Sequence, residues 1–207
     1  MNLQEFKEKV AEVKLQLDAE TGKCIGDKRL DWQFNASKVL KELSDARAEK
    51  FIAKYGLVDS VILVEEIAEL IQAITGVDQW AIVEEIADTQ LCLISQAQFH
   101  GITIFDYDKI KPHGKEELDQ LCAVDMATFE GLLTIIKALA GAQQIFCKNI
   151  RGKVVSEDDI LIAYFIIDTC CTMISKNLFD IDENTILAAG IVKADRISAR
   201  VRRADIK

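Results

Sequence analysis

Two short segments carry paired acids at a spacing that favours metal binding. They are "EEIAE" (65–69) and "EEIAD" (84–88), and each lies in an apolar run. Acids three residues apart share one face of a helix, so each segment would present two carboxylates in the same direction. Between Lys54 and Lys109 the sequence has ten acids and no lysine or arginine. The segment therefore cannot neutralise its acids with ion pairs of its own.

An antiparallel helical hairpin that turns at Val77 would bring these acids together. Glu66 precedes the turn by 11 residues, and Asp88 follows it by 11. Glu69 and Glu85 each lie 8 residues from the turn. Because both helices rise about 1.5 Å per residue, the acids would meet as two facing pairs. The four predicted metal ligands are Glu66, Glu69, Glu85 and Asp88.

Four carboxylates in one apolar patch repel one another strongly unless a cation neutralises them. An all-oxygen site suits Mg²⁺, with Mn²⁺ as the alternative. A solvated acidic face is the ordinary meaning of paired glutamates on a helix, but it predicts basic residues four positions away, and none is present. A di-iron bundle needs Glu-x-x-His, whereas Ala97 and Ile110 precede the two histidines by three positions. Mg²⁺ held by carboxylates shares its shell with phosphates and water, which predicts hydrolysis at phosphorus.

Nearly every segment repeats its apolar residues at helical period, which predicts an all-α bundle built around the acidic hairpin. The predicted helices cover residues 2–20, 36–54, 57–75, 79–99, 115–122, 125–148, 157–178 and 183–203. The segment "ADTQLCLIS" (87–95) also resembles "IDTCCTMIS" (167–175), although the second copy lacks the acid pairs. We interpret the chain as a single domain, 1–207, with an intact metal-binding half at 57–110 and a degenerate repeat at 124–187. Chance similarity between amphipathic helices is the alternative.

Charge and hydropathy narrow the choice of partners. The formal net charge of −9 disfavours nucleic acid and anionic membranes. No uncharged apolar run is long enough to span a membrane, and the first residues are too charged for a signal peptide. These features predict a cytoplasmic protein.

The acid pairs resemble the ExxE…ExxD signature of the MazG-like all-α nucleoside triphosphate pyrophosphohydrolases, a superfamily that includes the dimeric dUTPases. The resemblance covers residues 57–100. It implies Mg²⁺-dependent cleavage of a (d)NTP between the α and β phosphates, giving the monophosphate and pyrophosphate, in the control of nucleotide pools. It also implies metal binding by all four acids, with Glu66 and Glu69 in catalytic roles and Glu69 orienting the water.

Two further segments resemble this superfamily. "DWQFNASKVL" (31–40) is similar to its aromatic segment, which implies substrate contacts for Trp32, Phe34 and Lys38. Anchoring of a helix start by the two aromatic residues is the alternative. "IDENTILAAGIVKADRISAR" (181–200) resembles the segment that holds phosphate, which implies the same for Lys193, Arg196 and Arg200. A solvated or salt-bridging helix is the alternative there.

The sequence departs from the superfamily pattern at three places. The spacing between the aromatic segment and "EEIAE" is longer, and Ile197 stands where an asparagine is expected. The segment "KLQLDAETG" (14–22) is only faintly similar to the Gln-rich uracil-site motif of the dimeric dUTPases. The base therefore stays unassigned, and a homodimer stays open. The competing function is a catalytically inactive helical binding or regulatory protein that holds a structural divalent cation.

Overall fold

The computed structural model of the protein describes residues 1–51, 57–99, 112–126 and 128–203. Within these ranges all regular secondary structure is helical, as predicted. The helices are α1 (Leu3–Ala19), α2 (Ile25–Phe51), α3 (Leu57–Gly76), α4 (Gln79–Phe99), α5 (Pro112–Cys122), α6 (Phe129–Ile150), α7 (Glu157–Met173), the π-helical turn η2 (Ile174–Leu178) and α8 (Glu183–Arg202). No helix in the described ranges has the length and apolar character to cross a membrane.

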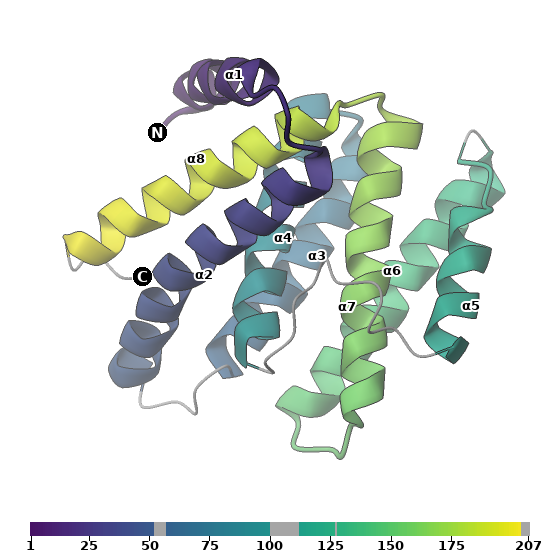
Figure 1. The fold of residues 1–207 in the computed structure, drawn as a ribbon. Helices are drawn as coiled ribbons and strands as arrows, with labels where there is room; N and C mark the ends of the chain where they lie inside the picture. Colours follow the sequence, from purple (N-terminus) through teal and green to yellow (C-terminus); the bar gives the residue numbers. More distant parts are fainter. Residues whose placement is uncertain (52–56, 100–111, 127, 204–207) are drawn as a thin grey trace.

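Helices α3 and α4 form the centre of the molecule (Figure 1). Helices α1, α2 and α8 pack together on one side of this pair, where α8 also contacts α4. On the other side α6 packs against α3 and α7, and α5 lies outermost against α7. The central hairpin is therefore covered from both sides.

A row of buried apolar residues on α3 determines which way the acids of this helix face. Leu63, Ile67, Leu70 and Ile74 follow helical spacing and are almost fully buried. Burial of each side chain contributes roughly 1.5–3 kcal/mol. The acids lie one position earlier, so their row runs beside the apolar row. The hydrophobic effect thus fixes the rotation of α3 and keeps its acids facing the neighbouring helices.

The predicted start of the second helix was wrong. Helix α2 begins at Ile25 rather than at residue 36. The break lies at Gly22, whose φ of 97° is a left-handed conformation that glycine adopts at little cost. Asp27 then accepts a hydrogen bond from the Cys24 N–H at 3.4 Å, one half of a capping box. The aromatic segment "DWQFNASKVL" therefore lies inside α2 and does not anchor a helix start.

Candidate metal centre and substrate cleft

The predicted turn at Val77 is confirmed. Val77 has a φ of +58°, and its N–H donates to the Ala73 carbonyl at 3.1 Å, which ends α3. Asp78 then caps α4, because its carboxylate accepts from the N–H of Trp80 at 3.0 Å and of Ala81 at 3.3 Å. The chain reverses within two residues, so α3 and α4 run antiparallel with little freedom in their register.

This register brings three of the four predicted carboxylates together. One oxygen from each of Glu66, Glu85 and Asp88 lies within 4.8 Å of the others. All three side chains are half-buried. Glu69 is exposed and stands outside this close group. It is nevertheless near enough to raise the pKa values of Glu66 and Glu85.

Burial and mutual repulsion make the carboxylates hold their protons tightly. Burial, followed by the charges of Asp88 and Glu69, raises the pKa of Glu66 from 4.5 to about 8. Burial and the same two neighbours raise the pKa of Glu85 to about 7. Burial is also the largest cause of the raised pKa of Asp88. The group is thus charged at high electrostatic cost near neutral pH.

Lys193 of α8 supplies countercharge that the hairpin lacks. Its ammonium lies 2.6 Å from Glu84 Oε1 and 2.5 Å from Asp88 Oδ2. Burial alone would lower the pKa of Lys193, but Asp88 and Glu84 raise it, and the net direction is upward. The resemblance implied a phosphate contact for Lys193. In the structure its ammonium lies against these two carboxylates, and the phosphate contact stays a prediction. Glu84, which lies off the predicted acid row, is the residue that sequence reasoning missed here.

The donor set is suited to a hard divalent cation. In the described part of the chain, Glu85 Oε2 is buried and has no hydrogen-bond partner. A buried carboxylate oxygen of this kind is costly unless something else binds it. The oxygen belongs to the same three-carboxylate group, and all its ligand atoms are oxygens. The residues present therefore fit Mg²⁺ or Mn²⁺.

A cleft of about 240 Å³ opens beside this group. Glu66, Asp88 and Lys193 line one part of it, whereas Glu69 and Glu85 do not line it. The remaining lining is mainly apolar and basic and consists of Leu40, Leu43, Ile62, Leu91, Cys92, Arg196, Ile197 and Arg200, together with Asp59 and Ser95. The cleft therefore joins an apolar wall, a cationic wall and the carboxylates.

The structure does not bring the predicted aromatic contacts to this cleft. Trp32 is buried and packs against Gly190, where an added Cβ would lie 2.4 Å from its ring. Phe34 is exposed, and the Lys38 ammonium lies 4.0 Å from its ring centre. None of the three lines the cleft. Helix α2 instead contributes Leu40 and Leu43, about two and three turns after Trp32, because its buried face continues at helical spacing.

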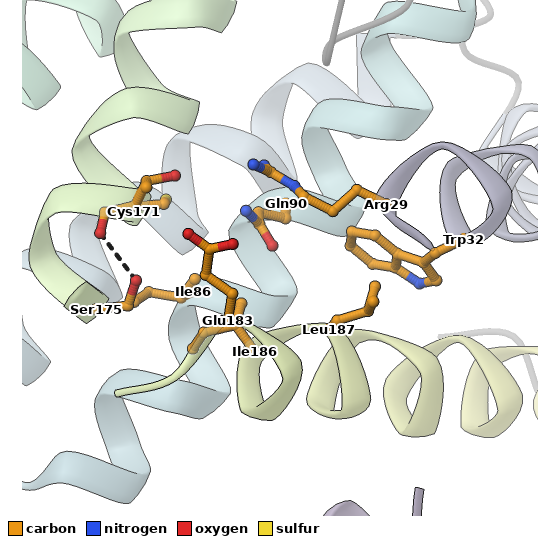
Figure 2. Close-up of a pocket in the computed structure, with 10 residues that line it drawn as sticks. Arg29, Trp32, Ile86, Gln90, Cys171, Ser175, Glu183, Ile186 and Leu187 are labelled. Atoms are coloured by element: carbon orange, nitrogen blue, oxygen red, sulfur yellow. Dashed lines mark hydrogen bonds between the residues drawn. The ribbon is translucent and has the colours of Figure 1, made fainter. Parts of the chain in front are cut away.

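Asp168, the counterpart of Asp88 in the predicted repeat, has a different environment. It is fully buried, and its Oδ1 accepts from Arg29 Nη2 at 2.8 Å and from Gln90 Nε2 at 3.2 Å. Figure 2 shows Arg29 and Gln90 close together at one edge of a small cavity, with Trp32 beside them. Arg29 thus supplies a countercharge for Asp168, as Lys193 does for Asp88. The repeat itself stays a prediction.

Comparison with known proteins agrees with this geometry. Residues 60–109 match the family model of the MazG nucleotide pyrophosphohydrolase domain. The matched segment contains all four predicted metal ligands. Neither the curated proteins nor the solved structures gave a match to the chain. The predicted resemblance to the MazG-like superfamily is thereby confirmed, through residues 60–109 of the chain.

Proposed function

We propose that the protein is a Mg²⁺-dependent nucleoside triphosphate pyrophosphohydrolase. It hydrolyses a (d)NTP to the (d)NMP and pyrophosphate and acts in nucleotide-pool control. The observation that carries this proposal is the group of Glu66, Glu85 and Asp88 at the edge of a cleft that also contains arginines. Such a group pairs a cation site with an anion site, which is what a metal-bound polyphosphate needs.

The acids of the hairpin have separate roles in this proposal. Glu66, Glu85 and Asp88 hold the cation, and Glu69 completes its surroundings. When bound, Mg²⁺ supplies charge that offsets the phosphate oxygens in the transition state. Glu69 is exposed, so its carboxylate is available to orient a water and accept its proton. Lys193 holds Asp88 and Glu84 in position from α8.

The cleft supports a nucleotide as the substrate class. Leu40, Leu43 and Leu91 give an apolar surface for the nucleoside. Arg196 and Arg200 line the same cleft, and neither forms an ion pair with any residue in the described ranges. Guanidinium groups without a protein counter-ion are suited to phosphate oxygens. The base is left open, because the side chains that line this cleft in the described part of the chain include no aromatic ring.

The domain organisation and the oligomeric state belong to the same proposal. We propose that residues 1–207 act as one domain in which 57–110 carries the chemistry and 124–187 supports it. The contacts of α6 with both α3 and α7 are consistent with this arrangement. The chain could also form a homodimer, and this would leave the proposed site unchanged.

The experiment is a turnover screen with a stability measurement alongside it. The wild type, Glu69→Gln and the exposed control Glu65→Gln are incubated with Mg²⁺ and each common NTP and dNTP, including dUTP. Monophosphate and pyrophosphate are expected from a subset of substrates, with loss of turnover only in Glu69→Gln. Absence of turnover from every substrate, with Mg²⁺ still raising the melting temperature, would favour an inactive protein that holds a structural cation.

A further inference from the structure

A second groove runs between α1 and α8 next to the cleft. Its volume is about 700 Å³, and its lining is polar and mainly cationic. Lys9, Glu12 and Gln16 line it from α1. Arg196 and Arg200 line it from α8, and Arg203, the C-cap of α8, lines it too. The sequence analysis did not single out Lys9 or Arg203.

The groove has more positive charge than the protein itself balances. Four cations line it against the two carboxylates of Glu12 and Asp195. Among the described residues, none of these four cations forms an ion pair. The three arginines follow one another at four and three positions along α8, so they share one face and repel each other. An anion bound in the groove would relieve this repulsion.

The groove and the cleft are continuous along α8. Arg196 and Arg200 line both of them. Arg196 is also close enough to Asp88 to oppose the rise of its pKa. The charged groups therefore follow one another from the carboxylates in the cleft, through the two shared arginines, to Lys9 and Arg203. Lys9 and Arg203 line the groove but not the cleft.

We propose that this groove holds the polyphosphate end of the substrate, with the nucleoside in the apolar cleft. This inference rests on the proposed function, and it fixes the orientation of the substrate in the site. Water bonds to the α-phosphorus, the bridging oxygen leaves with the β-phosphate, and the pyrophosphate remains in the groove as one proton is released. Lys9 and Arg203 then contact the terminal phosphate. They give the site a preference for triphosphates over diphosphates.

Binding of inorganic polyphosphate tests the groove without requiring turnover. Calorimetry with tripolyphosphate and no added metal is expected to show binding to the wild type. Lys9→Ala and Arg203→Ala should each weaken it about twofold to fivefold, as expected for exposed charge pairs. Lys153→Ala removes the same charge from an exposed turn, and Arg202→Ala removes an exposed arginine next to Arg203; both should bind like the wild type. The proposal is wrong if the control variants lose as much affinity for tripolyphosphate as the test variants, or if the wild type does not bind it.

Kinetics separate this inference from the proposed function. In the Lys9 and Arg203 variants, KM for a triphosphate should rise about twofold to fivefold, whereas KM for the matching diphosphate should not change. Turnover with an unchanged triphosphate KM would overturn the groove and leave the proposed function intact. Tripolyphosphate binding that is sensitive to Lys9, in a protein that hydrolyses no nucleotide, would support the groove as an anion site and overturn the proposed function.

Discussion

Replacing Glu66 by glutamine is predicted to stabilise the metal-free protein at pH 8, although the same change removes a metal ligand. The folded protein holds the pKa of Glu66 at about 8, against an ordinary value of 4.5. The folded state therefore retains a proton that the unfolded chain releases between these two values. Stability falls as pH rises through this window, since the unfolded state binds fewer protons there. Glutamine cannot ionise, so it escapes this loss.

The size of the effect follows from the two pKa values. At about 1.4 kcal/mol per pKa unit, the full difference corresponds to an upper bound of roughly 5 kcal/mol. Glu66 is half-buried beside an open cleft, so solvent screens part of this cost, and about 2 kcal/mol is the appropriate expectation. For a protein of this size, that corresponds to a rise of about 4–8 °C in Tm.

Thermal unfolding in the presence of EDTA measures this effect directly. Glu66→Gln should melt above the wild type at pH 8, and the two should converge below about pH 4, where both the folded and the unfolded state hold the proton. Glu65→Gln, on the exposed neighbour, should melt like the wild type at both values. With excess Mg²⁺ the order at pH 8 should reverse, because only the wild type retains the full ligand set. A variant that melts at or below the wild type at pH 8 without metal would refute the reasoning.

Three further predictions follow from the same geometry. The affinity for Mg²⁺ should fall about tenfold or more between pH 8 and pH 6, because Glu66 and Glu85 must release protons when the ion binds. Calorimetry at constant ionic strength measures this affinity, and an affinity that does not change with pH would contradict the prediction. Asp168→Asn should cost about 3 kcal/mol in urea unfolding, since it removes one partner of a buried ion pair, while leaving the Mg²⁺-induced rise in Tm unchanged; loss of that rise would place Asp168 at the metal. Gly190→Ala should cost about 1–3 kcal/mol because the new Cβ would overlap the Trp32 ring, and wild-type stability in urea would show that the two helices can separate there.

The acidic hairpin is the part of the molecule that sequence predicts best. Equal distances of Glu66 and Asp88 from Val77 fix their meeting once the helices and the turn are correct, because helical rise is nearly constant. The absence of basic residues in the segment is likewise visible in the sequence. Both inferences use only the spacing of residues within one segment. The structure has the close group of carboxylates that this spacing predicts, formed by Glu66, Glu85 and Asp88.

Relations between distant helices were not predictable in the same way. The pairing of Lys193 with Glu84 joins residues 109 positions apart, and that of Arg29 with Asp168 joins residues 139 apart. No periodicity encodes such pairings, since they depend on how α8 packs against the hairpin and on how α2 lies relative to α7. Trp32 shows the same difficulty. Its type indicates either a core residue or a ligand contact, and its packing against Gly190 of α8 joins two helices far apart in the sequence.

The most direct test of the central claim follows the terminal phosphate of the substrate. The protein is incubated with Mg²⁺ and the triphosphate that turns over fastest, labelled with ³²P at the γ position, and the products are separated by ion exchange. The proposed function predicts that all released label appears as pyrophosphate, with an equal amount of monophosphate, and that Glu69→Gln releases none. Label recovered as orthophosphate with the diphosphate would contradict it, because the bond broken would then be the one between the β and γ phosphates.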